Sequence, residues 1–214
     1  MSLPLQNQVV YGPIISRRLG VSLGINVLPA DCKFCLSNCI YCQYGWTDRN
    51  AIIKAKLPSR ELIIKMIRSS FEKLSSENLH IDTITFCGNG EPTLHPELKT
   101  IVLEVKRLRD QYLPTSQVSI FSDSTRVYFD NVREALELLD QRYMKLDAGD
   151  EKMHQRINQP LVNVQWEKMI RGLARLSDVI LQSLFVKGPI DNSKGEGYQK
   201  WLETVERIQP KKVY

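Results

Sequence analysis

The segment Cys35-Leu-Ser-Asn-Cys39-Ile-Tyr-Cys42 places three cysteines at the spacing Cys-x3-Cys-x2-Cys. A loop this short can bring three sulfurs around one inorganic centre, and thiolates are the ligands that zinc and iron–sulfur clusters prefer. Three ligands are one fewer than the four that close a structural zinc or cluster site. A [4Fe–4S] cluster held by three cysteines leaves one iron free to bind a small molecule. The spacing therefore favours a reactive centre over a structural one.

Two other interpretations of these cysteines stay open at this point. With Cys32 as a fourth ligand, the spacing Cys-x2-Cys-x3-Cys-x2-Cys would also suit a zinc-binding, non-catalytic module. A pure electron carrier would need four or more cysteine ligands. A disulfide framework is disfavoured, because the five cysteines are an odd number and the N-terminus has no signal-peptide pattern.

Outward from this loop, apolar residues alternate between strand-like and helical spacing. Strands are predicted at residues 21–28, 81–87, 117–122, 143–147, 179–186 and 211–214. Helices are predicted at residues 60–74, 96–112, 131–139, 164–176 and 196–208.

Strands that alternate with helix-sized crossovers predict a parallel sheet with the helices outside. The expected fold is a partial (β/α)6, TIM-like barrel over residues 21–214, preceded by an N-terminal extension at residues 1–20. The sequence ends at the expected sixth strand, so one expectation is that the barrel is truncated at this edge. Barrels of this kind place their chemistry at the carboxyl ends of the strands, where the cysteine loop would lie.

The composition indicates a soluble globular protein. Apolar residues make up 43% and charged residues 25% of 214 residues, which is ordinary for one domain. No apolar run approaches a membrane span, and a cytoplasmic location is expected because thiols stay reduced there. The net charge of +5 allows an anionic partner such as RNA without requiring one.

Several motifs together resemble one known family. The aromatic Tyr41 precedes the last cysteine, as in the radical S-adenosylmethionine (radical SAM) enzymes. The resemblance extends over five further segments: Tyr11-Gly-Pro-Ile-Ile-Ser-Arg-Arg-Leu-Gly20, Gly24-Ile-Asn, Tyr41-Cys-Gln-Tyr-Gly-Trp46, Gly88-Asn-Gly-Glu-Pro92 and Lys145-Leu-Asp-Ala-Gly-Asp150. These are similar to a branch described as Fe–S oxidoreductases, distantly similar to the wybutosine-synthesis enzymes.

The resemblance implies both chemistry and cofactors. Cys35, Cys39 and Cys42 would hold a [4Fe–4S] cluster whose open iron binds S-adenosylmethionine. An electron from a flavodoxin- or ferredoxin-type donor would split the cofactor into methionine and a 5′-deoxyadenosyl radical, which abstracts hydrogen from substrate. The family's glycine-rich element corresponds to Gly88, Asn89, Gly90 and Glu91, which would hold the methionine amino group. A simple glycine-rich turn is the alternative interpretation of that element.

The remaining candidates come from later strand ends. Tyr41 is expected against the adenine, and Ser122 and Asp123 near the ribose or methionine, although a capping turn would also explain that pair. Lys145 and Asp147 share one face of a strand, either as a cofactor-side pair or as a structural salt bridge. Gln182 is a further candidate, as a polar residue that points into the barrel. Arg17 and Arg18 are expected to reach substrate or cofactor, and His95 is expected near the glycine-rich loop. Cys87 is expected to pack as a small apolar residue.

The substrate does not follow from these patterns. A nucleic-acid base, a peptide side chain and a small metabolite all remain open, with a slight preference for RNA by analogy.

Overall fold

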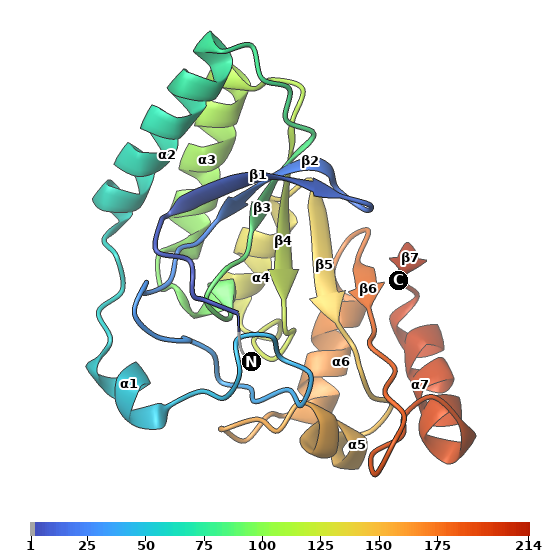
Figure 1. The fold of residues 1–214 in the computed structure, drawn as a ribbon. Helices are drawn as coiled ribbons and strands as arrows, with labels where there is room; N and C mark the ends of the chain where they lie inside the picture. Colours follow the sequence, from blue (N-terminus) through green and yellow to red (C-terminus); the bar gives the residue numbers. More distant parts are fainter. Residues whose placement is uncertain (1–2) are drawn as a thin grey trace.

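Residues 3–214, which the computed structural model describes, form one mixed sheet with helices packed along it (Figure 1). The strands cross the sheet in chain order: β1 (Val10–Ser16), β2 (Gly20–Ile25), β3 (Thr83–Phe86), β4 (Gln117–Ser122), β5 (Gln141–Lys145), β6 (Ile180–Gln182) and β7 (Lys212–Val213). β1 is antiparallel to β2, and each later pair is parallel. The parallel strands confirm the predicted partial barrel, which is open because β1 and β7 end the sheet at opposite edges.

Helices follow the strands much as the sequence predicts. They are α1 (Arg49–Lys54), α2 (Arg60–Ser76), α3 (Leu98–Tyr112), α4 (Asp130–Glu137), α5 (Glu151–Ile157), α6 (Trp166–Ala174) and α7 (Gly195–Ile208), with a short 3-10 turn η1 (Pro92–Leu94). α2 begins where expected because the Ser59 hydroxyl accepts a hydrogen bond from the Leu62 amide at 3.3 Å. None of the helices between residues 3 and 214 combines the length and apolarity of a membrane span.

The face of the sheet that meets the helices is apolar. Ile84 and Phe86 of β3 are fully buried, in the same hydrophobic cluster as Ile67 of α2 and Val105 of α3. Alternate residues of a strand point to opposite faces, so the residues between them point into the barrel. This layer supplies most of the buried apolar area, and hence most of the stability.

The inner face of the sheet is instead lined by hydroxyl groups near its centre. Thr85 Oγ1 lies 3.2 Å from Ser22 Oγ and 2.9 Å from Ser119 Oγ, so one hydrogen-bonded row crosses three strands. Thr83 donates to the Leu19 carbonyl at 2.8 Å. These hydroxyls satisfy one another, so this polar row can be buried inside the barrel.

The N-terminal segment holds one strand that the sequence did not predict. Val10–Ser16 pairs with β2, although Gly12 and Pro13 interrupt its strand pattern; Pro is tolerated at such a sheet edge. The ring of Tyr11 fills the space above Gly24, where any Cβ would overlap it. Gly24 therefore lets Tyr11 reach the inner face of the barrel.

Several element boundaries differ from the predictions. The predicted strand at 21–28 ends at Ile25, and the one at 179–186 shortens to Ile180–Gln182. Two short helices were not predicted, α1 and α5, which are capped by Asp48 and Asp150 respectively. Each carboxylate accepts a backbone N–H of the first turn, which fixes helices too short to show a clear apolar period.

Candidate active site

The cysteine loop lies between β2 and α1, at the carboxyl ends of β3, β4 and β5 (Figure 1). Cys35, Cys39 and Cys42 line one cavity of about 440 Å³, within the range of small-molecule sites. Most of the predicted site residues line the same cavity: Tyr41, Gly88, Gly90, Glu91, Ser122, Asp123, Lys145 and Gln182. The structure thus brings together segments that are up to 147 residues apart, from Cys35 to Gln182.

The loop is fixed by backbone hydrogen bonds on two sides. Toward the sheet, the Phe34 amide donates to the Asn89 carbonyl at 2.7 Å, and the Glu91 amide donates to the Phe34 carbonyl at 3.0 Å. On the other side, the Ile40 amide donates to the Ile157 carbonyl at 2.9 Å. The loop is therefore held between the end of β3 and the end of α5.

Gly90 permits the first of these approaches. Its φ is +148°, and a Cβ at this position would overlap the backbone of Phe34. Only glycine combines this conformation with so close a neighbour. The glycine-rich segment therefore positions the cysteine loop as well as lining the cavity.

The thiols have the chemistry of an iron–sulfur donor set. Burial raises the pKa of Cys35, and it raises the pKa of Cys39 to about 11. Both thiols are therefore protonated in the metal-free protein, and binding a metal would release these protons. Within residues 3–214, no three His, Cys, Asp or Glu side chains gather closely enough to hold a single metal ion. Three thiols that line one cavity match the cysteine ligands that iron–sulfur clusters use.

The other two cysteines have different surroundings. Cys32 is not among the residues that line the cavity, so the described part of the chain gives no geometric support for a zinc site of four thiols. Cys87 does line the cavity, which corrects the prediction that it packs as a small apolar residue. Its sulfur is hydrogen-bonded to the Tyr11 hydroxyl at 2.9 Å and donates to the Thr85 carbonyl at 3.4 Å.

Glu91 is buried, and its carboxylate is already engaged by protein groups. Oε1 accepts from the Ser122 hydroxyl at 3.0 Å and from the Thr93 amide at 3.0 Å, while Oε2 accepts from the Asp123 amide at 2.5 Å. Burial, together with the neighbouring Asp123 carboxylate, raises the pKa of Glu91. Glu91 therefore ties the end of β4 to the glycine-rich loop.

Asp123 is the carboxylate that faces the cysteine loop. Its Oδ2 accepts from the Ser37 hydroxyl at 3.0 Å and lies 3.9 Å from Cys35 Sγ. Its Oδ1 accepts from the amide and hydroxyl of Thr125, so the predicted capping turn is present as well. Asp123 is therefore the carboxylate that this wall of the cavity presents beside the cysteine loop, whereas the carboxylate of Glu91 is engaged by the Asp123 amide.

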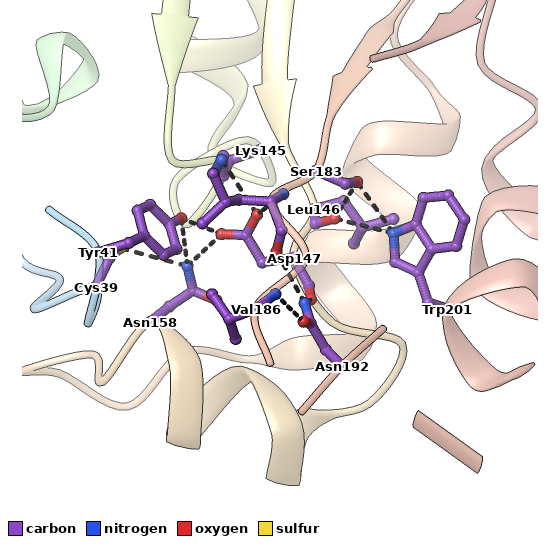
Figure 2. Close-up of polar contacts among 11 residues, drawn as sticks. Cys39, Tyr41, Lys145, Leu146, Asp147, Asn158, Ser183, Val186, Asn192 and Trp201 are labelled. Carbon is purple, nitrogen blue, oxygen red and sulfur yellow. Dashed lines mark hydrogen bonds and ion pairs between the residues drawn. The ribbon is translucent and has the colours of Figure 1, made fainter. Parts of the chain in front are cut away.

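Asp147 lies behind the cavity wall and joins several elements (Figure 2). Its side chain is fully buried; Oδ1 pairs with Lys145 Nζ at 3.2 Å and accepts from the Leu184 amide at 2.8 Å. Oδ2 accepts from the Tyr41 hydroxyl and, at 2.8 Å, from Asn158 Nδ2. The expected Lys145–Asp147 pair therefore exists, with Asp147 connecting the strand end to the cysteine loop.

Two predicted residues have additional partners. Lys145 Nζ lies 4.9 Å from the centre of the Tyr41 ring, a cation–π arrangement. Gln182, with its amide oxygen toward Arg18, accepts from Arg18 Nη2 at 3.2 Å. Arg18 also lies over the ring of Tyr214, so it packs against the β6–β7 edge of the barrel.

Some site residues were missed and two were misplaced. Asn158 contacts Cys39, and Ser37 within the cysteine loop donates to Asp123; nothing in the local sequence indicates either contact, because each partner is distant in the chain. Asn89, which was predicted to bind the cofactor, is fully buried and does not line the cavity; its side chain donates to the carbonyls of Gln6 and Pro29. His95 was expected near the site, but its ring contacts the Pro58 carbonyl and it does not line the cavity.

Comparisons with curated proteins identify relatives of nearly the whole chain. It is 34% identical over 210 residues to a UPF0026 protein of Methanocaldococcus jannaschii, covering 96% of this chain and 62% of that protein. A UPF0026 protein of Helicobacter pylori is 32% identical, covering 86% and 58%. A Brachyspira hyodysenteriae protein named GTPase Obg is 34% identical, covering 98% of this chain but 30% of that protein. The chain thus spans less than two thirds of these relatives.

Solved structures agree on the fold. TYW1 with a lysine–pyruvate adduct superposes with a TM-score of 0.62 at 21% identity, covering 88% of this chain and 62% of that chain. Streptococcus suis SuiB bound to S-adenosylmethionine superposes with a TM-score of 0.59 at 11% identity, covering 89% and 39%. These similarities concern the open barrel itself.

The match to a family model decides the classification. The model described as the radical SAM superfamily matches residues 31–208, from just before the cysteine loop to the end of α7. The matched range includes all three clustered cysteines and the strand ends that surround their cavity. The chain therefore belongs to the radical SAM superfamily.

Proposed function

We propose that this chain is a radical SAM enzyme in which Cys35, Cys39 and Cys42 hold a [4Fe–4S] cluster and the adjoining cavity binds S-adenosylmethionine. The proposal rests chiefly on the three thiols of one loop lining a single cavity beside two acidic side chains. The bound cluster and cofactor would supply a 5′-deoxyadenosyl radical that abstracts a hydrogen atom from substrate. The alternative of a zinc module is disfavoured because Cys32 stands apart from the cavity.

The surrounding residues orient the cofactor and shield it from water. The backbone of Gly88 and Gly90, free of Cβ atoms, allows a ligand to approach the strand end closely. Asp123 lines the same cavity, and its carboxylate would attract the positively charged groups of the cofactor. Tyr41, Lys145 and Gln182 form the opposite walls, where we place the adenosyl group.

The donor, compartment and substrate are proposed more broadly. A one-electron donor of the flavodoxin or ferredoxin class would reduce the cluster, and the five free cysteines suit a reducing compartment such as the cytoplasm. RNA is the preferred substrate class, by analogy with the wybutosine-synthesis enzymes that the sequence motifs distantly resemble and because of the positive net charge of +5.

Anaerobic reconstitution tests the reaction. Wild-type protein should bind about four irons with matching sulfide and, when reduced, release 5′-deoxyadenosine from S-adenosylmethionine. Cys39→Ala should lose both properties, whereas Cys32→Ala, a matched change outside the cavity, should keep both. Cleavage by Cys39→Ala at the wild-type rate, or a single zinc in the colourless wild type, would refute the proposal. Release of 5′-deoxyadenosine that rises with an RNA pool, compared with peptide or metabolite pools, would identify the substrate class.

A further inference from the structure

Asn158 joins the buried carboxylate of Asp147 to one of the clustered cysteines (Figure 2). It follows α5 directly, where its amide donates to the His154 carbonyl at 2.8 Å, and it is 4% exposed. Its Nδ2 lies 2.8 Å from Asp147 Oδ2 and 3.3 Å from Cys39 Sγ. The same nitrogen lies 3.4 Å from the Tyr41 hydroxyl, which itself donates to Asp147, so the shorter contacts direct the amide N–H groups to the carboxylate and the thiol.

The orientation of this amide is set by Asp147. The opposite orientation would bring the amide oxygen against the carboxylate, two acceptors without a proton between them. The Asn158 Oδ1 atom is buried and has no hydrogen-bond partner among residues 3–214. Leaving a buried acceptor unpaired is unfavourable, which is consistent with the contacts of the nitrogen deciding the orientation of the amide.

The position of the Asp147 carboxylate is fixed by contacts other than the one with Asn158. Lys145 Nζ and the Leu184 amide fix one carboxylate oxygen, and the side chain is fully buried. The chain from Lys145 through Asp147 to Asn158 therefore holds an N–H group against Cys39 from the far side of the loop.

Cys35 and Cys39 differ in what faces their sulfur. Cys35 Sγ lies beside the Asp123 carboxylate at 3.9 Å, and Cys39 Sγ lies beside an N–H donor at 3.3 Å. A donor to a ligating thiolate stabilises negative charge on the cluster, and the reduced cluster carries more of it. A donor to Cys39 should therefore make the cluster easier to reduce.

We propose that Asn158 is a positioning residue whose side-chain N–H donates to the Cys39 sulfur and raises the reduction potential of the cluster, with Asp147 holding the amide in place. The proposal rests on the proposed function, since it assumes a cluster on Cys39. It assigns to a residue at the end of α5 an influence on the reduction potential of the cluster.

The test compares Asn158→Leu with Asn192→Leu. Asn192 is a matched control because it is 1% exposed and donates to the Asp147 carbonyl at 2.7 Å and the Leu184 carbonyl at 2.9 Å. Both changes remove a buried amide from the same network, but only Asn158 contacts a cysteine. The reconstituted proteins would be titrated with reductant and followed by electron paramagnetic resonance.

The Asn158→Leu cluster should be harder to reduce by roughly tenfold in the equilibrium constant, about 59 mV for one electron. Asn192→Leu should keep the wild-type potential. Asn158→Ala, which also removes the side-chain donor, should shift in the same direction as Asn158→Leu. Loss of iron from both Asn158 variants, with iron retained in Asn192→Leu, would also support the inference through a weakened Cys39 ligand.

Equal potentials in wild type and the Asn158 variants, each with a full complement of iron, would overturn the inference and leave the proposed function intact. An equal shift in Asn158→Leu and Asn192→Leu would also overturn it, because the effect would then belong to the network and not to the contact with Cys39. A wild-type protein that binds no cluster would instead refute the proposed function.

Discussion

The two faces of the sheet differ in what holds them together. On the outer face, Ile84, Phe86 and Ile120 are fully buried against helices, and their packing is apolar. On the inner face, Thr85 and Ser119 satisfy each other through hydroxyl groups. The outer face is therefore held by apolar packing, whereas the inner face is held by hydrogen bonds between buried hydroxyls.

The same contrast continues at the carboxyl ends of the strands. There, Glu91 and Asp147 are buried carboxylates held by directed hydrogen bonds, and each fixes a segment of the cysteine loop or its neighbours. Such polar networks specify a single arrangement but contribute little net stability. Variants on the two faces should therefore separate folding from cluster chemistry.

The largest expected loss of stability is on the outer face. Phe86→Ala removes a fully buried ring and should lower the free energy of unfolding by roughly 3–5 kcal/mol in urea denaturation. Ser119→Ala, on the inner face, should cost only about 1 kcal/mol because a single neutral hydrogen bond is lost. Similar losses for the two variants would contradict the division between the faces.

Breaking the buried pair at Asp147 should have the next largest effect. Asp147→Asn leaves Lys145 without its carboxylate and should lower stability by roughly 2–3 kcal/mol, less than a fully buried pair because Lys145 is partly exposed. It should also reduce iron uptake, since Tyr41 and Asn158 lose their shared acceptor. The control is Asp150→Asn, because the Asp150 carboxylate caps α5 and pairs with Lys200 at the surface. This change should alter the free energy of unfolding by less than about 1 kcal/mol.

A Cβ at Gly90 should disturb the cysteine loop specifically. Gly90→Ala meets both a φ of +148° and the backbone of Phe34, and should cost about 1–3 kcal/mol and lower iron uptake. The control is Gly197→Ala in α7, where the nearest atom is the flexible end of Met153 and helix propensity favours alanine. Wild-type iron content in Gly90→Ala would show that the glycine-rich loop does not position the cysteines.

The smallest effect concerns pH. Burial lowers the pKa of His154, against the opposing charges of Asp123, Asp147 and Glu151. Below the ordinary histidine pKa of about 6.5, His154 takes up a proton in the unfolded chain, whereas in the folded protein it binds that proton more weakly. The stability that is present above this pH is therefore lost as the pH falls. His154→Gln should therefore weaken the decline in stability between about pH 6.5 and 5. Parallel urea-denaturation curves for wild type and variant across this range would disprove the assignment.

Much of the fold and the centre of the site followed from local sequence patterns. The cysteine spacing, the glycine-rich loop after β3 and the shared face of Lys145 and Asp147 are each written within a few residues, and the structure brings them to one end of the barrel. Apolar spacing located α2, α3 and the central strands for the same reason.

What the sequence did not predict depends on distant partners. Asn158 acquires its place only because α5 packs behind the cysteine loop, and Tyr11 reaches Cys87 only because β1 crosses Gly24. The resemblance assigned Glu91 to the cofactor, yet its hydrogen bonds to Ser122 and Asp123 arise from the adjacent strand end. Long-range neighbours of this kind leave no periodic signal in a single sequence.

The central claim is that three cysteines leave one iron of the cluster open to S-adenosylmethionine. Electron–nuclear double resonance of the reduced, reconstituted protein, with the methionine nitrogen of the cofactor labelled by ¹⁵N, tests this directly. The account predicts a ¹⁵N coupling to the cluster that appears when the cofactor is added and is absent from a sample with unlabelled cofactor. A reduced four-iron cluster that shows no such coupling at saturating cofactor would contradict it.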